Sequence, residues 1–224
     1  MFGVLFPDDC RVCGRELLGI SRIPVCPECL RAPEPLLADY FCANCRTPFL
    51  NAFPLDEQGL CRLCRAGRNG FDSAYSFGAY DGVLRTLIHV FKYGGVRTLA
   101  KPLAVFLGSA LPRGERFDLI VPMPMHWRRR WERGFNQARL LARAVGKRSG
   151  IPVASLARRR AAPPQAGLTN AQRRLNVAGI FRVRRPAALR GRRVLLIDDV
   201  LTTGATAAAC AQALKQAGAA SVTL

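Results

Sequence analysis

The chain has 224 residues, of which 50% are hydrophobic and 22% charged, and its formal net charge is +19. This length allows one large domain or a domain with a small module, and the apolar content excludes wholesale disorder. No stretch of about 20 apolar residues occurs, so no membrane-spanning helix is expected. The N-terminus has neither a basic region nor an apolar run of signal-peptide length, so we expect a cytoplasmic protein whose thiols stay reduced.

The positive charge is confined to one part of the sequence. Residues 1–72 carry eight arginines against nine acidic residues, a net charge of −1. Residues 73–224 carry 26 basic and six acidic residues, a net charge of +20. A surplus of this size attracts polyanions, so we expect the second part to bind phosphorylated metabolites, nucleic acid or an acidic partner.

Cysteines mark the first part as a separate module. Eight of the nine cysteines form four Cys-x-x-Cys pairs: Cys10/Cys13, Cys26/Cys29, Cys42/Cys45 and Cys61/Cys64. One tight turn presents both thiolates of a pair to a tetrahedral ion, and two turns complete a four-thiolate zinc site. Four sulfurs leave no open coordination position, so the predicted zinc, one ion or two, is structural. We therefore predict a zinc-ribbon module over 1–70 and a second domain over 71–224.

The spacing of the cysteine pairs leaves their partners open. Sequential pairing gives two ribbons, while interleaved pairing, nested pairing and a single occupied site also fit. A disulfide framework would need an oxidising compartment, which nothing in the sequence indicates. The ninth cysteine, Cys210, stands in a run of alanines and is interpreted as a small buried helix residue rather than a nucleophile.

The domain over 71–224 alternates predicted strands and helices. Loosely alternating aromatic residues predict a strand or hairpin at 71–80, and short apolar runs predict buried strands at 118–121, 193–197 and 221–224. Helices are predicted from Asp81 to the Gly94-Gly95 pair and over 97–110, 135–148 and 205–216. The arginine- and proline-rich residues 158–176 predict a long loop. This order predicts an α/β fold with a mainly parallel sheet flanked by helices.

A polar loop follows the predicted strand 193–197. Asp198 and Asp199 come at its carboxyl end, where open α/β sheets bind ligands. Backbone N–H groups at the start of the next helix and threonine hydroxyls form a cradle for a phosphate, and Gly204 allows close backbone approach. The alternative is a structural corner whose aspartates cap the helix. Two consecutive carboxylates before Thr-Thr-Gly-x-Thr are more than capping needs.

The stretch 194–206 resembles the phosphoribosyl-diphosphate (PRPP) signature of type I phosphoribosyltransferases. In that family Asp198 and Asp199 would hold the ribose hydroxyls as the catalytic pair, and magnesium would bridge oxygens of PRPP. Thr202 to Thr206 would hold the 5′-phosphate. The resemblance implies nine PRPP-binding residues: Asp198, Asp199, Val200, Leu201, Thr202, Thr203, Gly204, Ala205 and Thr206. Purine-salvage members usually carry an acidic residue at the position of Thr202, so the acceptor is not identified by this match.

Other segments agree with the same fold. The resemblance implies a pyrophosphate loop made of Pro122, Met123 and Pro124, with Arg133 and the arginines at 128–130 as phosphate ligands. A solvated basic helix face is the alternative for those arginines. His126 is a candidate base, although a surface or capping histidine is the simpler interpretation. Residues 158–175 resemble the flexible loop that closes over substrate.

A longer series of motifs runs along the chain. It comprises the Cys-x-x-Cys pairs, Phe91-Lys92-Tyr93-Gly94-Gly95, Val121-Pro122-Met123-Pro124, Arg133-Gly134-Phe135-Asn136-Gln137-Ala138, Pro164-Gln165 with Gly167-Leu168, Arg173 and Asn176, and the signature at 198–206. In this order the motifs resemble the ComF family of bacterial competence proteins. The resemblance implies a double zinc ribbon on a type I phosphoribosyltransferase-like fold. It also implies a cytoplasmic role in natural transformation, in the uptake and processing of single-stranded DNA, with a competence helicase of the ComF operon type as partner.

Different functions remain compatible with these motifs. One is a binding module that holds PRPP or handles single-stranded DNA through its basic domain. Another is an active magnesium-dependent phosphoribosyltransferase of nucleotide metabolism with an unidentified acceptor. It would act by displacement at the anomeric carbon, with arginine and magnesium stabilising the departing pyrophosphate. A third makes the zinc module a docking site for the helicase and the sheet a scaffold.

Overall fold

The computed structural model describes residues 9–17, 19, 22–155, 157–159 and 181–224, so most of the predicted closing loop at 158–175 lies outside the described residues. Its helices are α1 (Pro27–Arg31), α2 (Arg62–Arg65), α3 (Gly82–Lys92), α4 (Ala100–Ala110), α5 (Trp127–Arg133), α6 (Gln137–Ser149) and α8 (Ala205–Gln216), with 3-10 turns η2 (Arg97–Leu99) and η3 (Pro186–Leu189). Its strands are β1 (Tyr40–Phe41), β2 (Pro48–Phe49), β3 (Leu119–Pro122), β4 (Ala157–Arg159), β5 (Phe181–Val183), β6 (Arg193–Ile197) and β7 (Ser221–Thr223).

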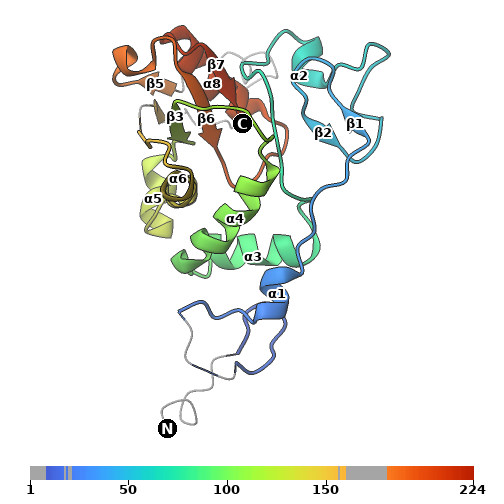
Figure 1. The fold of residues 1–224 in the computed structure, drawn as a ribbon, viewed down its shortest axis with the longest axis vertical. Helices are drawn as coiled ribbons and strands as arrows, with labels where there is room; N and C mark the ends of the chain where they lie inside the picture. The colour runs from blue at the N-terminus through green and yellow to red at the C-terminus, as the bar shows by residue number, and fades with distance from the viewer. Residues whose placement is uncertain (1–8, 18, 20–21, 156, 160–180) are drawn as a thin grey trace, which may run out of the picture.

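A three-stranded parallel sheet in the order β3-β6-β7 lies at the centre of the larger domain (Figure 1). Its register places Pro122 beside Ile197 on one side of β6 and Leu195 beside Thr223 on the other. Helix α6 packs against β3 and β6, and α8 packs against β7 and the antiparallel pair β4-β5. The strands are buried because helices cover them. The predicted mainly parallel sheet flanked by helices is confirmed.

The helices follow the predicted boundaries closely. Helix α3 begins after Asp81, although the Asp81 side chain makes no capping hydrogen bond. Helix α6 is capped by Asn136, whose side-chain oxygen accepts a hydrogen bond from the Arg139 N–H at 3.2 Å, and it ends at Gly150 in the left-handed region. The 3-10 turn η2 forms the first turn of the predicted helix 97–110. None of the described helices combines the length and the apolar character needed to cross a membrane.

The predicted strand or hairpin over 71–80 does not form as a regular element. Only Ser73 makes a parallel bridge, with Thr223, while the Tyr75 N–H donates to the Leu224 carbonyl at 2.8 Å. The other edge of this segment meets the cysteine-rich part of the chain, because the Ala74 N–H donates to the Cys45 carbonyl at 3.0 Å. The aromatic alternation therefore reflects a segment placed between β7 and the cysteines, and no neighbouring strand extends it.

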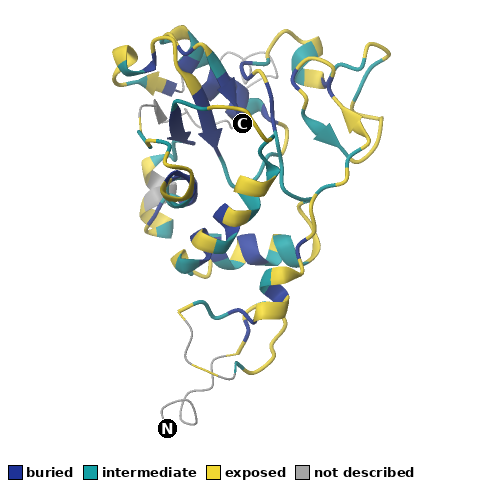
Figure 2. Ribbon diagram, viewed as in Figure 1, coloured by how far each residue is buried: buried dark blue, intermediate teal, exposed yellow. Residues whose placement is uncertain are grey.

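Two hydrophobic clusters form the core, and each includes cysteines from a different pair of Cys-x-x-Cys turns. We call residues 9–32 the first cysteine unit and residues 40–67 the second cysteine unit. The first unit joins the cluster of α3 and α4, and the second joins the cluster of α8 and β7. Figure 1 shows α1 next to α3 at one end of the molecule and β1, β2 and α2 at the upper right. Figure 2 shows the buried residues gathered on the sheet and on the inner sides of the helices.

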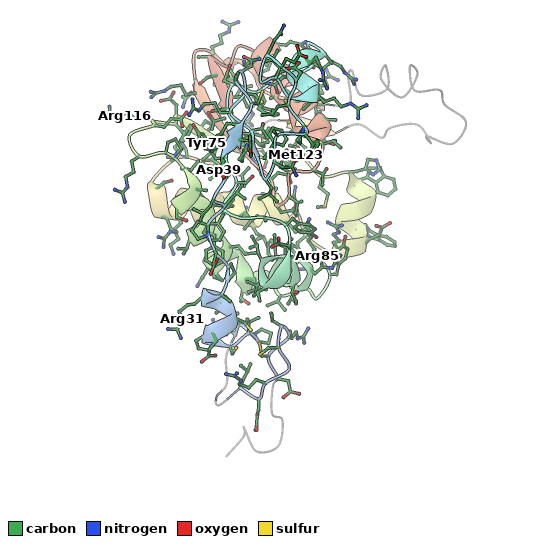
Figure 3. The ribbon with its side chains drawn as sticks, turned by 90° about the vertical axis from the view of Figure 1, so that its right-hand side faces the viewer. Arg31, Asp39, Tyr75, Arg85, Arg116 and Met123 are labelled. Carbon is green, nitrogen blue, oxygen red and sulfur yellow. The ribbon has the colours of Figure 1, made fainter. Side chains whose placement is uncertain are left out.

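A view turned by 90° shows how far the first cysteine unit lies from the end of β3. In Figure 3, Arg31 at the end of α1 lies in the lower part of the molecule, while Met123 after β3 lies in the upper part. The first cysteine unit is therefore remote from the carboxyl end of β3, where the predicted ligand-binding loops begin.

Candidate functional site

The carboxyl ends of β3 and β6 bring the two predicted phosphate-binding loops together. The two strands are parallel neighbours. At their ends the Met123 N–H donates to the Ile197 carbonyl at 2.8 Å. Asp198 and Asp199 follow Ile197 directly. Residues 122–124 and the stretch 198–206 therefore meet at one edge of the sheet.

A cavity of about 360 Å³ lies at this edge, and we call it the polar cavity. All nine residues of the predicted PRPP-binding stretch, 198–206, line it. Met123, Pro124 and Arg133 also line it, so most of the second predicted loop faces the same space. Pro122 is a buried residue of β3 and is not among the lining residues. Residues from segments far apart in the chain thus line one cavity.

Gly204 determines the shape of the signature loop. Its φ is +71°, a left-handed conformation that side chains with a Cβ rarely adopt, and it stands at the N-terminus of α8. A Cβ at this position would lie 2.9 Å from Leu63 Cδ1 of the second cysteine unit. The backbone conformation therefore favours glycine, and a larger residue would also require the flexible end of the Leu63 side chain to move. The N-terminus of α8, a helix of 12 residues, directs its positive dipole end and its N–H groups towards this loop.

The two carboxylates differ in their surroundings. Asp199 forms an ion pair with Lys92, with 2.9 Å between Nζ and Oδ1, and both side chains are largely buried. Burial raises the pKa of Asp198 to about 7, and the Asp199 carboxylate adds to the increase. The Asp199 N–H, which donates to Asp198 Oδ1 at 2.9 Å, and the Lys92 charge act in the opposite direction. Near neutral pH, one carboxylate is therefore neutralised by an ammonium group and the other in part by a proton.

Lys92 is a functional candidate to which the sequence analysis gave no role. It belongs to the Phe91–Gly95 motif, but its partner Asp199 is distant in the sequence. A lysine in the last turn of a predicted amphipathic helix usually faces solvent, so the pattern gave no signal for a buried ion pair. Tyr93, the next residue, also lines the polar cavity.

The Arg133–Gln137 motif connects this ion pair to the pyrophosphate loop. Arg133 donates to the Tyr93 hydroxyl at 3.1 Å, and its guanidinium lies 4.8 Å from the centre of the Tyr93 ring. The Asn136 amide donates to the Met123 carbonyl at 3.1 Å. The fully buried Gln137 lies at the centre, with its amide 3.5 Å from the Lys92 carbonyl. These contacts fix the corner between α5 and α6 against the cavity wall.

Other residues considered from sequence take different places. His126 is half-buried beside Trp127, with 5.5 Å between ring centres, and it does not line the polar cavity. The arginines at 128–130 belong to α5, but their side chains lie outside the described part of the structure. Cys210 is buried in α8 as predicted, and burial raises the pKa of its thiol.

The cysteines form two clusters, which decides between the pairings left open by sequence. One consists of Cys10, Cys13, Cys26 and Cys29, and the other of Cys42, Cys45, Cys61 and Cys64. Within each cluster the sulfur atoms all lie within 4.8 Å of one another, and the Cys13–Cys26 and Cys45–Cys61 sulfur pairs are 3.8 Å and 3.7 Å apart. Tetrahedral zinc with Zn–S bonds of about 2.3 Å places sulfurs ~3.8 Å apart. The pairing is sequential, and both clusters fit zinc.

The two clusters share the same backbone arrangement around one sulfur. The Cys26 N–H donates to Cys10 Sγ, and the Cys61 N–H donates to Cys42 Sγ, each at 3.3 Å. Burial raises the pKa of Cys10 and Cys42, but backbone N–H donors outweigh it and lower each value to about 6. Such donors favour the thiolate, which is the form that binds metal.

Comparison with known proteins agrees with this architecture. A family model described as the phosphoribosyl transferase domain matches residues 132–224. The chain is 31% identical to the DNA utilization protein YhgH of Salmonella typhimurium, over 96% of this chain and 94% of that protein. It is 30% identical to Competence protein F of Haemophilus influenzae, over 70% of this chain and 73% of that protein. It is 27% identical to Competence protein ComFC of Bacillus subtilis, over 87% and 79%.

Among solved structures, the glutamine PRPP amidotransferase from B. subtilis aligns with 57% of this chain and 25% of its own, with a TM-score of 0.42 and 19% identity. The two cysteine clusters, the parallel sheet with its signature loop and the similarity to YhgH and to Competence protein F lead to one assignment. The chain belongs to the ComF family and carries a phosphoribosyltransferase domain.

Proposed function

We propose that the protein binds PRPP with magnesium in the polar cavity. The observation that supports this proposal is the convergence of the whole 198–206 stretch with Met123, Pro124 and Arg133 on one space. The start of α8 and the threonine hydroxyls would hold the 5′-phosphate, and Asp198 and Asp199 would accept hydrogen bonds from the ribose hydroxyls. Arg133 would contact the pyrophosphate oxygens.

The donor set also suits the magnesium that accompanies such a ligand. Carboxylate oxygens and phosphate oxygens are the ligands that this hard cation prefers. Asp198 and Asp199 are adjacent, and both line the cavity. They would complete the coordination of an ion that enters with PRPP.

Calorimetric titration of the zinc-loaded protein with PRPP and magnesium tests this proposal. We expect saturable binding to the native chain and at least a tenfold loss of affinity in the double variant Asp198→Asn/Asp199→Asn. Asp81→Asn serves as the matched control, because Asp81 is exposed and its side chain makes no capping hydrogen bond. Unchanged affinity in the double variant, with folding intact, would contradict the assignment of these carboxylates.

A second candidate function is phosphoribosyl transfer to an unidentified acceptor. The match of residues 132–224 to the phosphoribosyl transferase domain favours it. Pyrophosphate release that requires both magnesium and an added acceptor would support transfer. Release that is independent of the acceptor would indicate hydrolysis of PRPP only.

We further propose a competence-related role in which the protein handles single-stranded DNA. Its relatives carry names such as Competence protein F and DNA utilization protein. On α5, Trp127 and Trp131 are 68% and 86% exposed, one helical turn apart in an arginine-rich segment. Exposed aromatic rings next to basic side chains stack on the bases of single strands while the cations contact the phosphates.

Fluorescence titration with a labelled single-stranded oligonucleotide tests the α5 assignment. Trp127→Ala/Trp131→Ala should weaken binding by at least tenfold, and the affinity of the native chain should fall steeply as salt rises. The control is Phe53→Ala, which removes an aromatic ring that is 95% exposed on the second cysteine unit. Equal losses in both variants would argue against α5 as the stacking surface.

A surface other than α5 is available to a helicase partner. Phe41, Leu50 and Phe53 of the second cysteine unit are all at least half exposed, which is unusual for large apolar side chains. We propose this unit as the docking surface, within a chain divided into a module over 1–70 and a domain over 71–224. Pull-down of the helicase should be weakened by Leu50→Asp/Phe53→Asp and unaffected by Trp127→Ala/Trp131→Ala. The reverse result would assign the partner to α5.

A further inference from the structure

The amino end of the parallel sheet is a second surface, opposite to the loops that line the polar cavity. Strands β3, β6 and β7 begin there, at Leu119, Arg193 and Ser221. The segment after α6 joins them, because Val153 forms a parallel bridge with Ile120 of β3. Helix α6 therefore runs from the corner beside the polar cavity to this amino end, over a length of about 20 Å.

Basic side chains gather at this amino end, and we call the surface that they form the basic face. Three segments supply them: the turn before β3, the last turn of α6, and the stretch from β5 through η3 to the start of β6. Glu115 and Asp118 are the acidic residues of these segments, so ten basic residues leave a net charge of +8. Figure 3 shows Arg116 at the left of the molecule and Met123, which follows β3, to its right. The ten basic residues are all exposed: Arg113, Arg116, Lys147, Arg148, Arg182, Arg184, Arg185, Arg190, Arg192 and Arg193.

Most of these cations have no acidic partner. Arg193 is an exception, because its guanidinium donates to both carboxylate oxygens of Asp118, at 2.9 Å and 3.1 Å. Arg192 donates to the Asp118 carbonyl at 3.5 Å. Within the described part of the chain, none of the other eight forms an ion pair. Lys147 and Arg148 stand in the last turn of α6, where they also offset the partial negative charge of the helix end. The remaining six have neither role, so their charge is available to a ligand.

The composition and the extent of the basic face favour phosphates arranged in a row. Nine of its ten cations are arginines, whose planar guanidinium binds phosphate oxygens in pairs. Residues 152–154, β3, β6 and β7 lie side by side, so at about 5 Å per strand the face extends about 15 Å. A DNA duplex carries one phosphate charge per about 1.7 Å of its axis, hence about nine over that length, and a single strand carries about half as many. Double-stranded DNA therefore matches the charge of the face better than a single strand does.

The basic face lacks the side chains that other anionic partners use. None of its described residues is large, apolar and exposed, in contrast to Trp127 and Trp131 on α5. Single strands are held by stacking on exposed rings, and membrane surfaces by insertion of apolar side chains. A duplex keeps its bases stacked inside and presents its phosphates, which cations alone can bind.

We propose that the basic face binds double-stranded DNA through its phosphates, at the end of the sheet opposite to α5 and the polar cavity. This inference goes beyond PRPP binding and the handling of single strands, and it depends on neither. The length of α6, about 20 Å, separates the two surfaces, which is twice the screening distance of about 10 Å at 0.1 M salt. A change of charge at one surface should therefore have little effect on binding at the other.

Fluorescence anisotropy with a labelled duplex of about 20 base pairs tests the proposal on the full-length, zinc-loaded protein. We expect saturable binding whose affinity falls steeply between about 50 mM and 200 mM salt. Arg184→Glu/Arg185→Glu should weaken duplex binding at least tenfold. Arg184→Gln/Arg185→Gln should lower the slope of log affinity against log salt by about 2, and it keeps the test valid if the charge reversal disturbs folding.

The matched control is Arg31→Glu/Arg85→Glu. It changes the net charge by the same amount at two exposed arginines, which Figure 3 shows in the lower part of the molecule, away from Arg116. Its duplex affinity should stay within twofold of the native value. Absence of saturable duplex binding, equal losses in the two charge-reversal variants, or an unchanged affinity in both Arg184/Arg185 variants would overturn the proposal.

Two further measurements separate this surface from other interpretations. Trp127→Ala/Trp131→Ala should leave duplex affinity within twofold, whatever its effect on single strands. Loss of duplex binding in that variant but not in Arg184→Glu/Arg185→Glu would assign the duplex to α5 and overturn the proposal. Co-sedimentation with vesicles of anionic phospholipid tests a membrane as the partner. If Arg184→Glu/Arg185→Glu impairs vesicle binding and leaves duplex binding intact, the basic face is a membrane-binding surface and the proposal fails.

Discussion

The two cysteine units carry the same ligand pattern but contact different parts of the molecule. The first packs on the helices α3 and α4, and the Thr98 hydroxyl donates to the Arg22 carbonyl at 2.7 Å. The second packs on the N-terminal part of α8, where Leu63 lies against Gly204. It is also hydrogen-bonded to the segment before α3, because the Cys45 carbonyl accepts from the Ala74 N–H. Identical sets of four cysteines therefore belong to one structural brace and to one unit that packs on the predicted binding region. We expect perturbations of the two units to separate stability from ligand binding.

The largest expected difference comes from removing one ligand of each cluster. Cys45→Ser and Cys26→Ser should each cost one zinc per chain, measured by elemental analysis, since both sulfurs are buried in their clusters. A structural zinc contributes apparent free energies of about 10–16 kcal/mol in small zinc modules. Loss of the ion should therefore unfold the affected cysteine unit as a whole. Only Cys45→Ser should weaken PRPP binding at least tenfold, with Cys26→Ser within twofold of the native chain.

Equal losses of PRPP affinity in those two variants would contradict the separate roles of the two cysteine units. Such a result would mean that the cysteine units act together on the sheet. Circular dichroism on each variant shows whether the larger domain is still folded, so that a general loss of structure is not read as a local effect.

A change of pH should have the next largest effect on stability. Asp198 lies in the signature loop, against which the second cysteine unit packs. Its pKa in the fold is raised to about 7, so the folded chain holds a proton that the unfolded chain releases near the ordinary aspartate value. The stabilisation is complete below the unfolded pKa and is lost as pH rises through about 7. The Asp198→Asn variant has no carboxyl at this position and does not lose this stabilisation. Its free energy of unfolding in urea, relative to that of the native chain, should therefore increase from pH 4 to pH 8 by up to about 4 kcal/mol. A pH-independent difference would contradict the buried, proton-binding carboxyl.

Glycine substitutions should show the contact between the second unit and the signature loop. Gly204→Ala meets a backbone cost of about 1–2 kcal/mol for the left-handed conformation and a smaller added cost, because the end of the Leu63 side chain must move. Gly150→Ala, with φ of +76° and open space around the added Cβ, should meet only the backbone cost. Leu63→Ala should partly rescue Gly204→Ala in thermal unfolding and leave Gly150→Ala unchanged. Additive effects of Leu63→Ala and Gly204→Ala would argue against the contact.

The smallest expected effect concerns the first unit alone. Thr98→Ala removes the hydrogen bond to the Arg22 carbonyl and should lower the free energy of unfolding by about 1 kcal/mol. PRPP affinity should be unchanged, because neither Thr98 nor Arg22 lines the polar cavity. A measurable loss of PRPP affinity would show that the first unit also influences the binding region.

Much of the fold could be predicted because the apolar patterns and the positions of the glycines indicate the same helix and strand boundaries. Helix α8 runs from Ala205 to Gln216 as expected, between Gly204 and Gly218. Residues 122–124 meet residues 198–206 because β3 and β6 are parallel neighbours whose carboxyl ends lie at one edge of the sheet, and this order of strands was not predicted from the sequence. The predicted roles of these residues in binding PRPP stay predictions.

Other features depended on tertiary packing and left no local pattern. The gaps between the cysteine pairs fit several pairings. The sequential pairing becomes visible only in the folded chain, where each cluster packs with a different part of the core. The ion pair of Lys92 with Asp199 joins segments distant in the sequence, so neither residue indicated the other. A cavity of about 390 Å³ beside the polar cavity likewise gathers residues from the second unit, α3, α4 and β6, whose side chains would each be expected to fill a core.

If PRPP binds as proposed, the Lys92–Asp199 ion pair would make its entry an exchange of counter-ions. The ammonium group of Lys92 balances Asp199, and a proton partly balances Asp198 near neutral pH. An approaching polyphosphate therefore meets little bare negative charge at the carboxylates. Asp198 and Asp199 would hold a magnesium ion that accompanied PRPP, Asp198 as a deprotonated carboxylate, and Lys92 would be free to pair with a phosphate group. Binding measured in buffers of different ionisation enthalpy should then reveal a released proton.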